Sequence, residues 1–174
     1  MNDAPAPFPF PAGAPFDPAI VAQIMNGRGH GGFIGLRYVA HGEDWIEVSL
    51  PWRADLVGVP ETGVLASGPI ITLLDNATSM SVWVKSGAFR PQATLDLRLD
   101  YVRAATPGKT VVARAECYRL TRSAAFVRGL AHDGDPADPV AHAAGVFMTV
   151  EAEREPGRRS SPSMWPAASP ITTF

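Results

Sequence analysis

The chain has 174 residues, 46% of them hydrophobic, which is enough for one domain with a substantial core. Its 15 basic and 17 acidic residues leave a net charge of -2 without a long basic cluster, which argues against nucleic acid as a partner. A single cysteine excludes an intramolecular disulfide and, without companion ligands, argues against structural zinc, so we expect a cytoplasmic protein with no metal and no cofactor.

The two ends of the chain differ in composition from its middle. The opening residues are rich in proline and lack the basic region and uninterrupted apolar run of a signal peptide. The last residues are rich in Pro, Ser, Arg and Ala and show no periodicity. We therefore expect a lead-in over residues 1–16, one folded domain over residues 17–150 and an irregular tail over residues 151–174.

The domain should open with a short helix. Asp17 can cap this helix, Pro18 suits its first turn and Gly27 can end it. The residues expected to pack inward are Ile20, Val21 and Ile24.

A glycine-rich stretch, GRGHGG at residues 27–32, follows this helix. Such a stretch could cradle a phosphate group only if a helix came next, whereas residues 33–40 have the pattern of a strand. We interpret the stretch as a flexible approach to that strand. Residues 45–50 should form a second strand that pairs with the first as an antiparallel hairpin.

The longest element is an apolar helix predicted over residues 65–85, LASGPIITLLDNATSMSVWVK. Ser67 is its expected cap, and Gly87 should end it. Its polar residues would lie at hydrocarbon depth in a bilayer, which argues against a membrane span. The residues on its core face, at helical spacing, are Ile70, Leu73, Ala77, Met80 and Val84.

Asp75 stands out because it is the only charged residue between Glu61 and Lys85. It lies opposite the core face, beside Thr72 and Ser79. Desolvation of an unpaired carboxylate is costly, so an acid in such a segment is paired, hydrated or used for chemistry. These considerations alone favour a structural or hydrated acid over a catalytic one.

The second half of the chain has the patterns of strands. Residues 92–103 alternate cleanly, and strand patterns recur at residues 110–120, 123–132 and 140–150. We expect an α+β fold in which this antiparallel sheet wraps around the long helix, because its apolar face needs a cover. In the first of these strands one face should carry Leu95, Leu97, Leu99 and Tyr101, and the other Thr94, Asp96, Arg98 and Asp100.

Parts of the chain resemble the hot-dog-fold acyl-CoA thioesterases, specifically the phenylacetate-degradation type of the 4-hydroxybenzoyl-CoA thioesterase superfamily. The resemblance covers roughly residues 31–150. It is carried by the helix centre Leu73-Leu74-Asp75-Asn76-Ala77, the strand from Asp96 to Tyr101, and the Pro107-Gly108 turn after it. It implies the hot-dog fold, an acyl-CoA substrate, and a homodimer or a tetramer of two dimers, with two sites at each dimer interface.

The resemblance also implies roles for individual residues. The family's helix acid, a general base or nucleophile in thioester hydrolysis, corresponds to Asp75. The backbone amides that polarise the thioester carbonyl correspond to Ser67 and Gly68, and a hydroxyl from the second subunit that orients water corresponds to Thr94. Among Arg90, Lys109, Arg122 and Arg128, which could contact the phosphates of coenzyme A by charge alone, Arg122 is the best candidate because it lies in a hairpin between two strands near the family's nucleotide side; the alternative for each is an ordinary solvated surface residue. The full set of expected substrate contacts is Glu61, Asn76, Ser79 and Arg122.

The loop before the helix departs from the family pattern. Where this branch usually has His-Gly-Gly, the chain has Ala66-Ser67-Gly68, and Glu61 is the nearest polar candidate for an upstream Asn. An oxyanion hole built from backbone N–H groups tolerates a change of side chain, so we expect an acyl-CoA thioesterase. The alternative is a non-catalytic protein that binds acyl-CoA or another hydrophobic ligand on the same fold.

Three other kinds of site lack their signatures. Ser67 does not stand in the G-x-S-x-G pattern of a serine hydrolase. A hot-dog dehydratase pairs its helix acid with a loop His, and Ala66 stands where that His would be sought. The turn at residues 133–138 carries three aspartates but not the loop of an EF-hand, so we interpret it as a polar hairpin turn.

Overall fold

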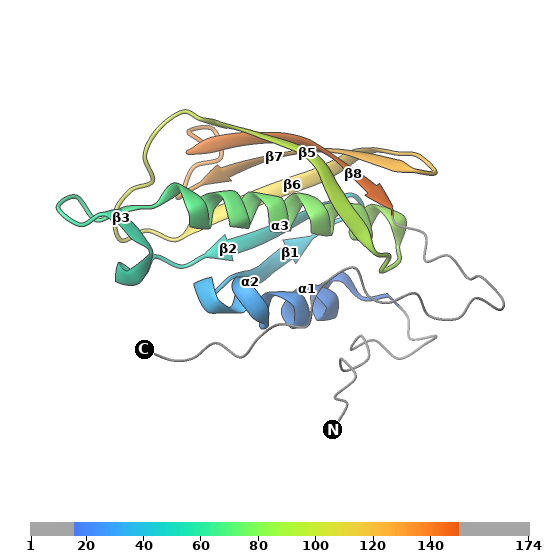
Figure 1. The fold of residues 1–174 in the computed structure, drawn as a ribbon, viewed down its shortest axis with the longest axis horizontal. Helices are drawn as coiled ribbons and strands as arrows, with labels where there is room; N and C mark the ends of the chain where they lie inside the picture. The colour runs from blue at the N-terminus through green and yellow to red at the C-terminus, as the bar shows by residue number, and fades with distance from the viewer. Residues whose placement is uncertain (1–15, 150–174) are drawn as a thin grey trace, which may run out of the picture.

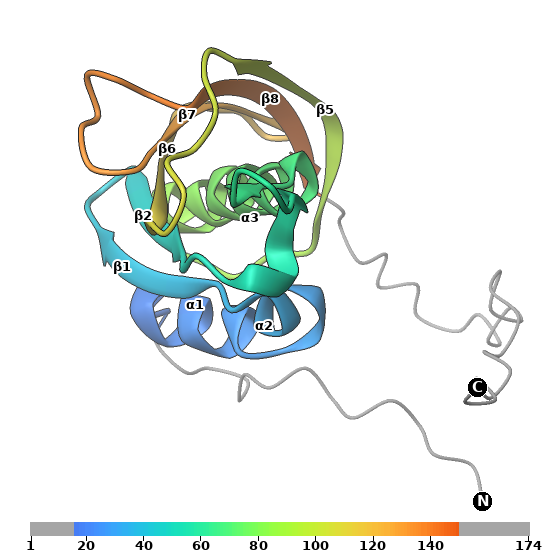
Figure 2. The same ribbon diagram turned by 90° about the vertical axis from the view of Figure 1, so that its left-hand side faces the viewer.

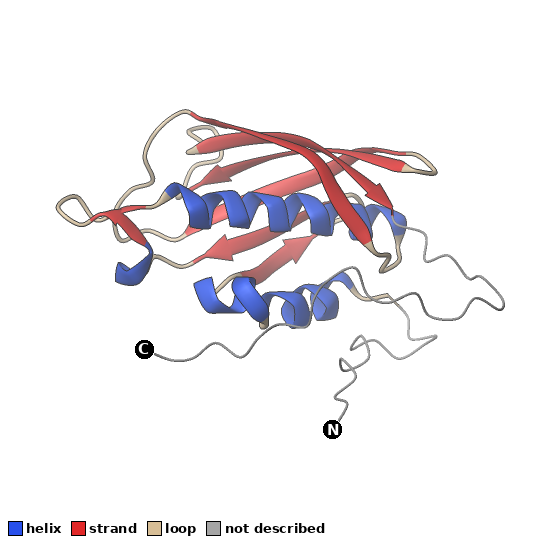
Figure 3. Cartoon of the chain, in the orientation of Figure 1, coloured by secondary structure: helices blue, strands red, loops and turns tan. Residues whose placement is uncertain are grey.

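The computed structural model describes residues 16–149. The tail predicted over residues 151–174, and all but the last residue of the predicted lead-in, lie outside this range. One long helix packs against an antiparallel sheet (Figures 1 and 3). The helices are α1 (Pro18–Asn26), α2 (Gly29–Ile34) and α3 (Ser67–Ser86), with a short 3-10 helix, η1 (Ala54–Leu56). The strands are β1 (Arg37–His41), β2 (Trp45–Leu50), β3 (Val57–Val59), β4 (Val64–Leu65), β5 (Gln92–Tyr101), β6 (Val111–Leu120), β7 (Ala124–His132) and β8 (Ala141–Thr149).

Six of the strands form one sheet in the order β1-β2-β6-β7-β8-β5, and every neighbouring pair is antiparallel. Figure 2 shows the sheet curving around α3. The short strands β3 and β4 form a separate hairpin just before α3. The predicted α+β class, with an antiparallel sheet wrapped around one central helix in the hot-dog arrangement, is confirmed.

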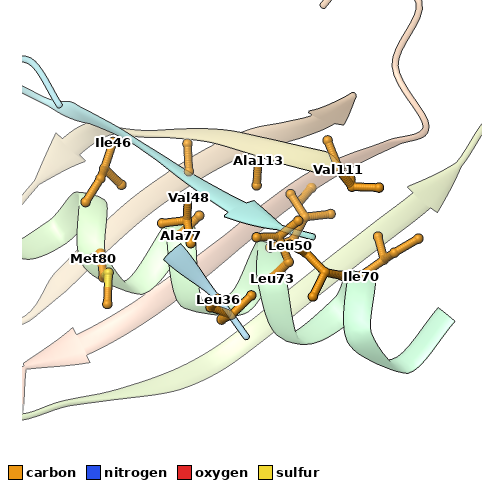
Figure 4. Close-up of a cluster of buried hydrophobic side chains, with 14 of the residues drawn as sticks. Leu36, Ile46, Val48, Leu50, Ile70, Leu73, Ala77, Met80, Val111 and Ala113 are labelled. Atoms are coloured by element: carbon orange, nitrogen blue, oxygen red, sulfur yellow. The ribbon is translucent and has the colours of Figure 1, made fainter. Parts of the chain in front are cut away.

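The core lies between α3 and the sheet (Figure 4). In β2 the alternating residues Ile46, Val48 and Leu50 are buried against it. Burying one such side chain contributes roughly 1.5–3 kcal/mol, so this layer dominates the stability of the domain. The five residues predicted for the core face of α3 are all buried: Ile70, Leu73, Ala77, Met80 and Val84.

The N-terminal cap of α3 differs from the prediction, whereas its C-terminal cap agrees with it. Ala66 is at the N-cap position and Ser67 is already helical, so the prediction of Ser67 as the cap is wrong. Pro69 lies in the first turn, where a missing N–H leaves no helical bond unmade. Gly87, with φ of 61°, ends the helix as predicted. Within residues 16–149 no helix is both long and apolar enough to cross a membrane.

The glycine-rich stretch is not a flexible approach to a strand. Residues 29–34 form α2, and β1 begins only at Arg37. Ile34 is 1% exposed, and its burial in the core outweighs the low helix propensity of the glycines before it. Gly35, with φ of 82°, ends this helix in a left-handed conformation that glycine adopts without strain.

The first helix, α1, begins and ends as predicted. The Asp17 carboxylate accepts two backbone hydrogen bonds from the first turn, and Gly27 is at the C-cap. Val21 is buried and Ile24 half-buried, but Ile20 is 53% exposed. The prediction that Ile20 packs inward is therefore wrong, because the buried residues of α1 are Val21, Ala22 and Asn26, and Ile20 lies outside the stripe that they form.

Candidate active site

The face of α3 opposite the core carries Asp75. Thr72 and Ser79 lie beside it, as predicted, together with Asn76, and all four side chains are half-buried. Strand β5 crosses over this face of the helix (Figure 1). Asp75 thus lies where the polar face of α3 meets an edge strand of the sheet.

Asp75 accepts a hydrogen bond from Thr94 in β5. Thr94 Oγ1 lies 3.1 Å from Asp75 Oδ1. Both residues belong to one chain, which differs from the expectation that a second subunit supplies Thr94 to this aspartate. Thr94 is also exposed, so the pair is accessible to water and to a ligand.

A β-bulge turns Thr94 toward the helix. In the pairing of β5 with β8, Thr94 lies opposite Phe147, while Asp96 lies opposite the residue before Phe147. Leu95 is therefore the extra residue of the bulge and has no partner. Directly opposed side chains lie on the same face of a sheet, and Phe147 is buried on the inner face. Thr94 consequently faces inward, whereas strict alternation would turn it outward.

The same bulge overturns the prediction for Leu95. Alternation groups Leu95 with Leu97 and Leu99, which do pack against the core. Leu95 itself is 59% exposed, because one inserted residue shifts the alternation by one position.

The N-terminus of α3 is exposed and has no capping side chain. Ala66, at the N-cap, makes no side-chain hydrogen bond to the first turn. Ser67 and Gly68 are exposed, and a Cβ placed on Gly68 would meet no atom within 4 Å. The first N–H groups of a helix have no partner within it, and the helix dipole makes this end attractive to negative charge. The amides of Ser67 and Gly68 are therefore well placed to bind an oxyanion.

Within one chain the two parts of the predicted site are separated. Gly68 and Asp75 are seven residues apart in α3, which is about 10.5 Å along a helix axis. A carbonyl oxygen bound to the Gly68 amide is then too far from water held by Asp75, since each contact needs about 3 Å. The structure brings Asp75 and Thr94 together and keeps Ser67 and Gly68 apart from them.

Two further predicted contact residues lie close to Asp75 on the helix. Ser79 accepts two hydrogen bonds from Gln92 Nε2, one on its carbonyl oxygen and one on Oγ, both at 2.7 Å. Asn76 Oδ1 is buried and has no hydrogen-bond partner among the described residues. Asn76 thus retains an unused acceptor next to the acid.

Arg122 and Glu61 lie near opposite ends of α3. Arg122, in the turn between β6 and β7, lines a pocket of about 130 Å³ together with Arg90. Within residues 16–149 neither guanidinium has an ion-pair partner. The helical residues of this pocket are seven to eleven positions beyond Asp75, about 10–16 Å along the axis. Glu61 is exposed in the turn between β3 and β4, before the start of α3.

Tyr101 belongs to the site, although alternation merely groups it with the leucines of β5. Its Oη donates a hydrogen bond to the carbonyl oxygen of Ser67, at 3.0 Å. Burial raises the pKa of Tyr101 above its ordinary value, so its hydroxyl stays a donor. This hydrogen bond could not be predicted, because its acceptor is a backbone carbonyl, which every residue has. The only hint in the sequence was a tyrosine at the end of the predicted strand.

In the turn at residues 133–138, which carries three aspartates, Asp133 forms an ion pair with Arg103. Arg103 binds the Asp133 carboxylate through two nitrogens, at 2.7 and 3.0 Å, and the Thr106 N–H donates to it at 2.6 Å. The Arg103 guanidinium holds the pKa of Asp133 well below its usual range. These bonds tie the loop after β5 to the turn before β8.

The chain is similar to known proteins of one family. The model of the thioesterase superfamily matches residues 62–140. A solved protein of Pseudomonas aeruginosa is 37% identical, with a TM-score of 0.68 over 74% of this chain and 96% of that one. Among curated proteins compared by sequence, none matches.

Two more distant structures share the fold. A phenylacetic acid degradation protein of Thermus thermophilus, solved as a mutant, is 24% identical, with a TM-score of 0.59 over 68% of this chain and 96% of that one. A thioesterase of Haemophilus influenzae is 19% identical, with a TM-score of 0.67 over 78% of this chain and 91% of that one. The chain therefore belongs to the thioesterase superfamily.

Proposed function

We propose that this protein hydrolyses acyl-CoA thioesters to a free acid and coenzyme A. The observation that carries the proposal is the hydrogen bond between Thr94 and Asp75 on an accessible face of α3. A neutral hydroxyl orients the carboxylate without forming an ion pair, whereas an arginine partner would engage it in a salt bridge and make it a weaker base and nucleophile. Membership of the thioesterase superfamily supports this class of reaction.

Asp75 acts as general base or as nucleophile. As a base, its carboxylate takes a proton from water while the water oxygen attacks the thioester carbon. The tetrahedral intermediate then loses the sulfur, and the proton passes to the departing thiolate. As a nucleophile, the Asp75 carboxylate attacks the thioester carbon and expels coenzyme A as a thiolate, which leaves a mixed anhydride between Asp75 and the acyl group; water then hydrolyses this anhydride to the free acid and restores the carboxylate, and the thiolate takes up the proton that is released. Thr94 orients the carboxylate in both routes, and the attacking water in the first.

The oxyanion is bound by a second copy of the chain. The amides of Gly68 and Ser67 lie about 10.5 and 12 Å along the helix axis from Asp75 of their own chain, too far to share one carbonyl group with it. A homodimer that sets the start of α3 of one copy against the middle of α3 of the other brings the two parts together. Glu61, in the turn before the helix start, then reaches the substrate from the same side as these amides.

Two features support such a homodimer. Strand β5 is an edge of the sheet, and an unpaired edge can continue into the sheet of a second copy. Large exposed apolar side chains are also a mark of surfaces that become covered. Those on α3 and the β5 segment are Ile71, Leu95, Tyr101 and Val102. A tetramer built from two such dimers is the larger assembly that we propose.

Coenzyme A extends from Asp75 toward the pocket of Arg90 and Arg122. Two guanidinium groups without ion-pair partners among the described residues suit the phosphates of the nucleotide. The pocket begins about 10 Å beyond Asp75 along α3, a separation that an extended pantetheine arm spans. Asn76 and Ser79 lie on this path, and their half-buried side chains are the polar contacts that we propose for the arm.

The test is the release of free thiol from short, medium and aryl acyl-CoAs. We expect turnover by the wild type and a fall in kcat of at least about 100-fold in Asp75→Asn, the usual scale for removing an acid–base group. Asp96→Asn is the matched control, because Asp96 lies two residues from Thr94 on the opposite face of β5. Equal rates in wild type and Asp75→Asn would remove Asp75 from the mechanism.

The same experiment decides between hydrolysis and binding alone. Ala66, in place of the His usual in the resembled branch, favours the non-catalytic alternative. Tight binding of acyl-CoA without turnover of any substrate in the panel would establish that alternative and overturn the proposed hydrolysis.

A further inference from the structure

Three side chains of β5 donate hydrogen bonds to α3, and the last of them is Tyr101. The first two, Gln92 and Thr94, reach the middle of the helix. Tyr101 Oη reaches the carbonyl oxygen of Ser67, at 3.0 Å, in the first turn. The strand that orients the acid therefore also binds the exposed start of α3.

The carbonyl that Tyr101 binds is in the same peptide unit as the Gly68 N–H. A trans peptide is planar, and its C=O and N–H point in opposite directions. Holding the Ser67 carbonyl in place therefore sets the direction of the Gly68 N–H. A hydrogen bond accepted by the oxygen also withdraws electron density from the nitrogen, which makes the N–H a stronger donor.

We propose that Tyr101 is a positioning residue that orients and polarises the Gly68 amide for binding the oxyanion. The inference rests on the proposed hydrolysis, in which this amide stabilises the tetrahedral intermediate. Tyr101 itself touches neither the substrate nor the reacting atoms. It acts through the single peptide unit that joins Ser67 to Gly68.

The start of α3 needs such support because little else fixes it. Ala66 provides no cap, and both Ser67 and Gly68 are exposed. Helix ends without caps fray, and a frayed N–H is a poor partner for a transition state. Tyr101, by contrast, is anchored in the sheet by its pairing with Ala141 in β8.

In the proposed dimer, the contact between Tyr101 and Ser67 affects the active site that contains the aspartate of the other chain. The Gly68 amide of one chain serves the Asp75 of the other, so Tyr101 tunes the site to which its own aspartate does not belong. Thr94 and Tyr101, seven residues apart on β5, consequently act on two different active sites.

The test compares Tyr101→Phe with Tyr118→Phe. Each change removes one hydroxyl, but Tyr118 is 55% exposed on β6 and its hydroxyl has no bond within the described range. In Tyr101→Phe we expect kcat to fall about 3- to 10-fold, the scale of one hydrogen bond, with KM changed less than about twofold. The amide proton resonance of Gly68, observed in protein labelled with ¹⁵N-glycine, should move upfield. In Tyr118→Phe, kcat, KM and the Gly68 resonance should all stay unchanged.

A double-mutant cycle separates this role from a general structural one. Gly68→Pro removes the N–H at a position in the first turn that accepts proline. If Tyr101 acts through this N–H, Tyr101→Phe has no further effect on kcat in the Gly68→Pro background. An equal fall in both backgrounds would overturn the inference, and so would an unchanged kcat in Tyr101→Phe.

The outcomes also separate the inference from the proposed function. If the wild type turns over no acyl-CoA, the hydrolysis fails, and the Gly68 resonance alone decides the coupling. A resonance that moves in Tyr101→Phe but not in Tyr118→Phe supports the coupling. A resonance that stays in place in both variants overturns it.

Discussion

Thr94 and Asp75 are 19 residues apart in the chain and are joined by a hydrogen bond of 3.1 Å between the edge strand and the central helix. The bond gives the carboxylate one fixed direction while leaving its second oxygen for water or substrate. It depends on the bulge at Leu95, without which the hydroxyl would face away from the helix. The orientation of Asp75 is therefore a property of how β5 pairs with β8.

Removing the Thr94 hydroxyl should slow the reaction at the chemical step. We expect kcat of Thr94→Val to fall about 10-fold or more, the scale of a hydrogen bond to a charged group, with KM little changed. Thr94→Ser keeps the hydroxyl and should retain most of the activity. Steady-state kinetics on the best acyl-CoA of the panel measures both, and equal losses in the two variants would contradict an orienting role.

Two variants that each lack one part of the site should restore activity when mixed. Asp75→Asn removes the base, and Gly68→Pro removes the amide donor, each from every site of its own homodimer. A mixed dimer has one site with both groups intact and one with neither. Equal mixing after reversible dissociation should therefore recover about a quarter of the wild-type activity, as expected for statistical pairing in a two-fold dimer.

The amount of activity recovered on mixing is the critical measurement. Mixed samples without prior dissociation are the control, because their dimers have not exchanged chains. No recovery in exchanged samples, despite mixed dimers seen by native mass spectrometry, would show that both parts of the site come from one chain.

The Arg103–Asp133 ion pair should make the free energy of unfolding depend on pH. The pKa of Asp133 is depressed by Arg103, so the charged carboxylate stabilises the fold. That contribution is complete above the unfolded pKa of about 3.9 and is lost as the pH falls below it. Thermal unfolding from pH 7 to pH 3 should show Asp133→Asn less stable than wild type at neutral pH, with the gap narrowing in acid. Glu43→Gln, at an exposed position, should follow the wild type throughout.

The sequence was most informative where periodicity and burial coincide. Five apolar residues at helical spacing located the core face of α3, and Asp75 was conspicuous as the only acid on the other face. Propensity failed where tertiary burial decided the outcome, as in α2, whose glycines are held helical by the buried Ile34.

The site itself was predictable only in part. Alternation assigned Thr94 to the outer face, since a bulge inserts a residue without leaving a mark in the sequence. The contact of Tyr101 with Ser67 was equally hidden, because its acceptor is a backbone carbonyl. Side chains that act on the main chain have to be found from coordinates, whereas an isolated charge in an apolar helix can be found from the sequence.

Replacing Ala66 with a capping residue should raise the stability of the fold and lower the activity. A capping side chain bonds the N–H of the second or third helical residue, and here the third is Pro69, which has none. Only the Gly68 N–H would remain for the cap. Ala66→Asp should therefore stabilise the fold by about 0.5–2 kcal/mol and at the same time inhibit the enzyme, because its own carboxylate would take the place of the oxyanion. Under the proposed mechanism, a helix end without a cap is what leaves room for the oxyanion, at the expense of folding stability.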